Sequence, residues 1–144
     1  MKRILLAGTF ALSLCVGGLG SSDENIYTTK GMLNGRHWNR ISEELDSDSV
    51  VWLVKGTYIK GFYDGIFWLN SIGKEPETDE VVNKLGKVPV ADLVKAINAL
   101  FADDANVDFP IPVVVLAEVM RLNGEISEER YAHWLHEMRK TFSK

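Results

Sequence analysis

A stretch of mostly apolar residues runs from Val50 to Ser71 and constrains the architecture more than any other segment. Placed at helical steps, its apolar residues cover one broad face, and Thr57, Lys60, Asp64 and Ser71 form a narrow polar stripe opposite. A helix that is apolar over most of its circumference is usually buried on most sides. We therefore predict an all-α bundle of about five or six helices wrapped around this central helix. A strand over Val50–Val54, which is rich in β-branched residues, is the alternative for its beginning.

Capping residues and apolar spacing predict the remaining helices. The first expected helix is capped by Asn34 and runs to Ile41, and a short one follows from Thr78 to Gly86. Two more are expected from Pro89 to Phe101 and over Ile111–Leu122. The last is capped by Ser127 and carries on one face Tyr131, Trp134, Leu135, Met138 and Phe142. Residues 23–33 and 42–48 are expected to be irregular, and Asp103–Asn106 a turn. A strand at Val113–Val115 is the alternative to the fourth helix.

Three glycines lie inside the predicted central helix, at Gly56, Gly61 and Gly65. Each costs about 1 kcal/mol relative to alanine in a helix interior, so something should offset that cost. Gly61 and Gly65 share a face with Val54, where missing side chains let another helix approach closely. We predict close packing within the bundle there. The functional alternative is a groove for a partner or ligand, edged by Trp68, which makes candidate binding residues of Lys60, Gly61, Asp64, Gly65 and Trp68.

The first 22 residues have the pattern of a cleavable signal peptide. Lys2 and Arg3 precede the apolar run Ile4–Val16, and small residues follow it. That run is shorter than the roughly 20 apolar residues that cross a bilayer, so we expect no membrane span. A buried N-terminal helix is the alternative. We expect an exported protein, periplasmic or secreted, with one helical domain at residues 23–144.

Cys15 raises the question of a lipid anchor. Leu12 and Ser13 fit a lipoprotein motif, but Leu14 stands where a small residue is required, so ordinary cleavage near Gly20 or Ser22 is favoured. Cleavage after Ser22 leaves no cysteine, which excludes disulfides, thiolate metal sites and a cysteine nucleophile.

The charge balance argues against nucleic-acid binding. Without Lys2 and Arg3, the 16 basic residues become 14 against 20 acidic ones, and the net charge changes from −4 to −6. Nucleic-acid affinity depends mainly on basic groups that neutralise phosphates, and no basic run occurs. A basic protein is the partner that this charge suits.

The candidates for site chemistry are weak. His133 and His136 can ligate zinc if they converge, but their helical phase puts them on the solvent side of the last helix. Asp104 to Asp108 imitates the opening of a calcium loop, yet Phe109 stands at the required glycine and Val115 at the required glutamate. We predict no metal, no cofactor and no catalytic residues. A ligand- or metal-binding module is one alternative, and a cell-wall enzyme is the least favoured.

The segment Tyr58-Ile59-Lys60-Gly61-Phe62-Tyr63-Asp64-Gly65 resembles the Y-I-x-G-x-x-D helix of the Rap/Tai-type immunity proteins. Looser similarity continues through Val88–Val94 and Asp103–Asn106. Such proteins are small, exported and helical, and they neutralise peptidoglycan-cutting type VI secretion effectors. The resemblance implies an immunity-type inhibitor and makes Gly61, Asp64 and Gly65 framework positions. The paired cysteines that are common in these proteins are absent here.

Overall fold

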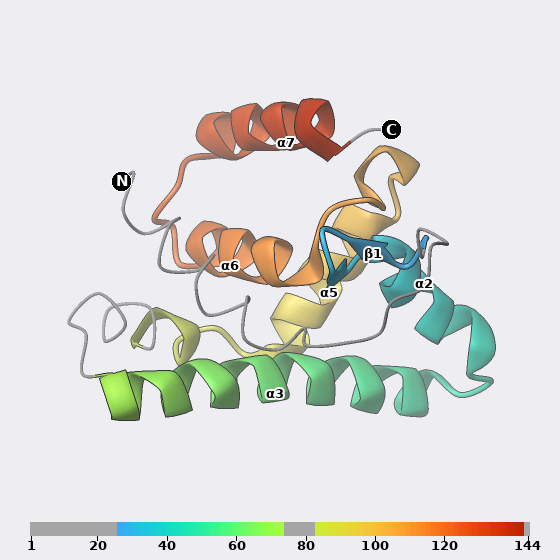
Figure 1. The fold of residues 1–144 in the computed structure, drawn as a ribbon, viewed down its shortest axis with the longest axis horizontal. Helices are drawn as coiled ribbons and strands as arrows, with labels where there is room; N and C mark the ends of the chain where they lie inside the picture. The colour runs from blue at the N-terminus through green and yellow to red at the C-terminus, as the bar shows by residue number, and fades with distance from the viewer. Residues whose placement is uncertain (1–25, 74–82, 143–144) are drawn as a thin grey trace.

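The computed structural model describes residues 26–73 and 83–142, and this part of the chain is mostly helical (Figure 1). In chain order the elements are β1 (Thr28–Thr29), β2 (Met32–Leu33), α2 (Gly35–Glu44), α3 (Asp48–Gly73), α5 (Val90–Phe101), the 3₁₀ helix η2 (Asp104–Asn106), α6 (Ile111–Leu122) and α7 (Glu128–Phe142). The predicted signal peptide at residues 1–22 and the predicted cap at Thr78 lie outside the described residues. Among the described helices, none is both long enough and apolar enough to cross a bilayer.

The predicted central segment forms α3, a single helix that extends the expected range at both ends. The alternative of a strand at its beginning is therefore wrong. Asp48 lies in its first turn, where a carboxylate interacts favourably with the helix dipole. Ile59, Tyr63 and Ile66 are buried along one side of α3, and Tyr58 and Phe62 are half-buried beside them.

The centre of the molecule is α5, and the prediction that the bundle wraps around α3 is wrong. α5 contacts α2, α3 and α6, and in Figure 1 it passes between α3 along the bottom and α6 above. Its buried residues are Leu93, Val94, Ile97, Leu100 and Phe101. Among the described residues, other helices cover only one side of α3. Apolar residues around much of its circumference therefore did not mean burial on most sides.

The two C-terminal helices follow their sequence signals closely. α6 has the predicted bounds, so the alternative of a strand at Val113–Val115 is wrong. Pro110 holds the backbone extended before the helix, and Pro112 is tolerated in its first turn. In α7 the hydroxyl of Ser127 accepts a hydrogen bond from the Arg130 amide at 3.3 Å. α7 packs on α6, with Tyr131 buried and the rings of Phe109 and Trp134 meeting edge to face.

A small hairpin precedes α2 where an irregular segment was expected. Thr28 pairs with Leu33 and Thr29 with Met32 in antiparallel register. The turn between the strands places Lys30 at φ 51° and Gly31 at φ 78°, the left-handed region that glycine adopts without strain. Two-residue strands are too short to show an alternating pattern, so this hairpin has little sequence signal.

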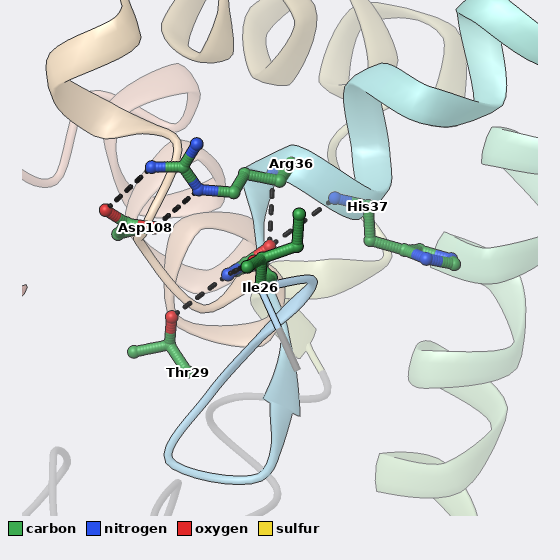
Figure 2. A network of polar contacts seen from close by, with 6 residues as sticks. Ile26, Thr29, Arg36, His37 and Asp108 are labelled. Carbon is green, nitrogen blue, oxygen red and sulfur yellow. Dashed lines mark hydrogen bonds and ion pairs between the residues drawn. The ribbon is translucent and has the colours of Figure 1, made fainter. Parts of the chain in front are cut away.

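Asn34 joins the hairpin to α2, as Figure 2 shows for its labelled partners. Its side-chain oxygen accepts hydrogen bonds from the amides of Arg36 at 3.1 Å and His37 at 3.4 Å, which confirms the predicted cap. Its amide nitrogen donates to the Ile26 carbonyl at 3.0 Å and to the Thr29 hydroxyl at 3.1 Å. Because Asn34 is buried, a side chain without these polar atoms would leave the two amides, the Ile26 carbonyl and the Thr29 hydroxyl without these hydrogen bonds.

Candidate protein-binding face on helix α3

Helix α3 carries most of the exposed large hydrophobic side chains of the described residues. The described residues include nine exposed large hydrophobic side chains, and seven of them lie on α3. The most exposed of these are Trp68 at 62%, Ile72 at 61% and Leu53 at 59%. Single exposed apolar residues are ordinary, but these seven gather in two groups, one between Val50 and Val54 and one between Phe67 and Ile72, and such groups are typical of interaction surfaces.

Gly61 and Gly65 of α3 open onto solvent. A Cβ atom added to Gly61 or Gly65 would have no neighbour within 4 Å, so the predicted close packing within the bundle is wrong at both positions. They lie on the side of α3 opposite Tyr63, whereas α5 covers the Tyr63 side. Gly56 does pack internally, because a Cβ there would lie 3.6 Å from Cγ1 of Val90.

We define the outer stripe of α3 as seven residues that follow one another at intervals of three or four and therefore share one face of the helix. They are Val50, Val54, Thr57, Gly61, Gly65, Trp68 and Ile72. All seven are exposed. The outer stripe is apolar at both ends and has only backbone atoms at the two glycines near its middle, so another helix can approach closely there.

One ion pair borders the outer stripe. Nζ of Lys60 lies 3.1 Å from Oδ1 of Asp64, and the two side chains are 70% and 63% exposed. The predicted i, i+4 pair is therefore present, and such an exposed pair is worth a few tenths of a kcal/mol. The structure thus brings all five predicted binding residues onto one exposed side of α3, while their role stays a prediction.

The other predicted candidates lie apart from this face. His133 and His136 are both exposed on α7, as their helical phase predicts. Within residues 26–73 and 83–142, no three His, Cys, Asp or Glu side chains gather as metal ligands would.

The segment that imitates a calcium loop uses its side chains within the fold. Just before this segment, the Asp103 carboxylate accepts a hydrogen bond from the Ala105 amide at 3.0 Å, within the turn predicted over Asp103–Asn106. Asn106 is buried, donates to the Leu100 carbonyl at 2.9 Å, and accepts from Nε of Arg139 at 2.9 Å.

Lys55 is a buried cation that the sequence analysis did not single out. Its side chain on α3 is only 2% exposed, and its ammonium group donates to the Ser42 hydroxyl at 2.7 Å and to Oδ1 of Asn98 at 2.9 Å. Nζ also lies 4.9 Å from the centre of the Trp38 ring. No carboxylate of the described residues pairs with it, and burial lowers the pKa of Lys55 to about 8.

A sequence signal for Lys55 was available. At helical steps its position lies between those of Phe62 and Ile66, near the middle of the buried side of α3. A lysine in that phase places at least its aliphatic stem against the core. A desolvated lysine can serve as a nucleophile. Here Nζ points at two hydrogen-bond acceptors and a ring, so the structure supports a structural role.

Glu118 is the buried carboxylate of the described residues. It is 1% exposed and accepts hydrogen bonds from Arg121, through Nη2 at 2.7 Å and Nε at 2.9 Å, and from the hydroxyl of Tyr131. Burial first, and then the bond to Glu118, raise the pKa of Tyr131. Both carboxylate oxygens accept hydrogen bonds, so this cluster joins α6 to α7.

A small hollow opens beside the start of α5, and no residue of α3 contributes to it. Its walls are formed by Lys87, Val88, Pro89, Asp92, Leu122 and Asn123. Neither Lys55 nor Glu118 reaches it.

Comparison of the chain with models of protein families, with curated proteins and with solved structures finds no match.

Proposed function

We propose that this protein is an exported binding protein that docks another protein on the outer stripe of α3, and that it acts by binding rather than by catalysis. One observation carries this proposal: of the nine exposed large hydrophobic side chains among the described residues, seven lie on α3 and four of these belong to the outer stripe. Leaving apolar area in water is unfavourable by about 25 cal/mol per Å², so covering it with a partner is favourable. The buried ionisable groups Lys55 and Glu118 already have partners within the fold.

The specific form that we propose is an immunity-type inhibitor of a periplasmic, cell-wall-cutting effector. Its support is the resemblance of residues 58–65 to the immunity-protein helix, together with the signal-peptide pattern of residues 1–22. The net charge of −6 without that peptide favours a basic partner, because complementary potentials accelerate association.

A matched pair of substitutions tests the binding face. Ile72 on the outer stripe and Ile26 before the hairpin are 61% and 62% exposed, so Ile72→Asp and Ile26→Asp make the same chemical change at equal exposure. The full chain, tagged at its C-terminus, would be expressed with its signal sequence, and the proteins that copurify would be identified by mass spectrometry. We expect a partner that is retained by the wild type and by Ile26→Asp and lost by Ile72→Asp. Equal recovery by all three proteins would contradict docking on the outer stripe.

The inhibitor form has its own measurement. The purified wild type and both variants would be titrated against a panel of peptidoglycan-cleaving enzymes, with the loss of turbidity of isolated cell walls as the readout. We expect the wild type and Ile26→Asp to slow at least one enzyme, and Ile72→Asp to do so less. If the wild type slows none of these enzymes, the result would count against the inhibitor form. The copurification experiment would then decide separately whether the outer stripe binds a protein.

A further inference from the structure

Three exposed carboxylates lie close together in the chain where α2 joins α3. We call them the acidic corner, and they are Glu43, Asp46 and Asp48. Within residues 26–73 and 83–142, no lysine or arginine forms an ion pair with any of them, whereas the neighbouring Glu44 is paired with Arg40. The beginning of α3 therefore carries negative charge that this part of the fold does not neutralise.

The rest of the exposed side of α3 has no such excess of charge. Lys60 and Asp64 pair with each other, and the outer stripe is apolar again at Trp68 and Ile72. The ammonium group of Lys55 is buried and forms no ion pair with the described carboxylates. The exposed side of α3 is thus acidic at its beginning and uncharged at its end.

The acidic corner adjoins exposed apolar side chains. Asp48 lies in the first turn of α3, and Trp52, which is 47% exposed, follows it by four residues on the same side of the helix. Leu53, at 59% exposure, lies one residue further on. Lysine and arginine suit such a surface, because their stems cover apolar groups while their charged heads reach carboxylates. An exposed indole ring also attracts a cation to its face.

We propose that the partner docked on the outer stripe places a cluster of lysine or arginine side chains on the acidic corner and its apolar side chains along the stripe toward Ile72. An apolar or acidic partner would desolvate these carboxylates without supplying a counter-charge, which is unfavourable. The proposal rests on the proposed function and specifies its partner. Net charge alone favours a basic protein in any orientation, whereas the acidic corner fixes the end of α3 at which the cations lie.

Synthetic helical peptides provide the probe. One peptide spans about 33 Å, the length of α3 from Val50 to Ile72, and carries leucines along one face and a cluster of lysines at one end. A second peptide has glutamates in place of the lysines. Fluorescence anisotropy would measure the binding of each to the purified full chain. We expect tighter binding of the lysine peptide, and a smaller difference between the peptides at about 1 M salt, where the Debye length is about 3 Å.

A matched pair of triple variants separates the acidic corner from net charge. The corner variant combines Glu43→Gln, Asp46→Asn and Asp48→Asn. The distal variant removes the same amount of charge from η2 and α7 through Asp104→Asn, Glu128→Gln and Glu129→Gln, and in Figure 1 α7 lies on the other side of α6 from α3. Thermal unfolding would confirm that both variants fold. We expect the corner variant to bind the lysine peptide about tenfold more weakly than the wild type, and the distal variant to lose less than about twofold.

Carbodiimide cross-linking locates the cations directly, because it joins a carboxylate to a lysine amine that contacts it. We expect mass spectrometry to find the lysines of the peptide joined to the acidic corner. Equal binding of the two peptides, equal losses in the two triple variants, or cross-links mainly at Asp104 and Glu129 would each overturn the inference. The proposed function would survive any of these results if Ile72→Asp abolished the copurification of a partner and Ile26→Asp did not.

Discussion

Nζ of Lys55 donates a hydrogen bond to Oδ1 of Asn98 across 2.9 Å, and this oxygen also accepts from Nε1 of Trp38 at 2.7 Å. A single amide oxygen on α5 thereby accepts hydrogen bonds from α2, through Trp38, and from α3, through Lys55. No carboxylate of the described residues pairs with this buried ammonium group. Within that part of the chain its charged form is stabilised by the hydrogen bonds and by the Trp38 ring, and the fold bears the cost of desolvation.

Replacing Lys55 should remove that cost. Burial lowers the pKa of Lys55 to about 8 from 10.5, so between these pH values the unfolded chain binds more protons than the folded one. This contribution therefore makes the fold more stable as pH rises from about 8 to 10.5, and the penalty is fully present below pH 8. We expect Lys55→Met to raise the free energy of unfolding at pH 7 by on the order of 1–3 kcal/mol, and the gain to shrink toward pH 10.

Urea denaturation of both proteins at several pH values measures this difference. Lys95→Met, which removes an exposed lysine from α5, is the matched control and should change stability by less than about 0.5 kcal/mol. Parallel stability curves for the wild type and Lys55→Met from pH 7 to 10 would show that the buried charge costs nothing.

Local signals in the sequence were sufficient for most helix boundaries. Asn34, the prolines before α6 and Ser127 act within one or two turns, so their effects do not depend on tertiary contacts. The arrangement of the helices depends on which apolar faces meet, and helical periodicity does not contain that information. For this reason α5 was not recognised as the central helix.

The same limit applies to the candidate site. Periodicity placed Gly61, Gly65 and Trp68 on related faces of one helix, but it could not show that no other element covers them. Their exposure follows from the position of α5 against the Tyr63 side of α3. The hairpin was missed because its strands are too short to alternate.

Removing the hydroxyl of Tyr131 should destabilise the fold, whereas removing that of Tyr63 should not. The Tyr131 hydroxyl donates to buried Glu118, so Tyr131→Phe leaves a carboxylate oxygen without its donor, at a cost of about 1–3 kcal/mol. The Tyr63 hydroxyl has no partner among the described residues, so Tyr63→Phe should be neutral or stabilising. Thermal unfolding of the two variants makes the comparison. A larger loss for Tyr63→Phe would mean that the Glu118 cluster contributes little.

Alanine should have opposite effects at two helical glycines. A Cβ at Gly35 would overlap the ring of Phe101, and overpacking of this kind costs about 1–3 kcal/mol. A Cβ at Gly61 meets no atom within 4 Å, so Gly61→Ala should gain about 0.5–1 kcal/mol from helix propensity. Chemical denaturation with urea in dilute solution measures both. Destabilisation by Gly61→Ala under those conditions would contradict the open face of α3.

Asn34 should be sensitive in two separable steps. Asn34→Ala removes the cap of α2 and both hydrogen bonds to the hairpin, and we expect a loss of about 2 kcal/mol or more. Asn34→Ser keeps an oxygen that can cap the helix but loses the two amide donations, so its loss should be smaller. Circular dichroism during urea titration gives both values. Equal losses would indicate that the cap itself contributes little.

The position of α7 has a consequence for the order in which the protein is assembled. α7 contributes one buried residue, Tyr131, whereas α6 contributes seven. α7 also follows α2, α3, α5 and α6 along the chain, so those helices can contact one another before α7 is available. We therefore expect α7 to dock onto a preformed body, and its amide hydrogens to exchange with solvent through openings that leave the other helices intact.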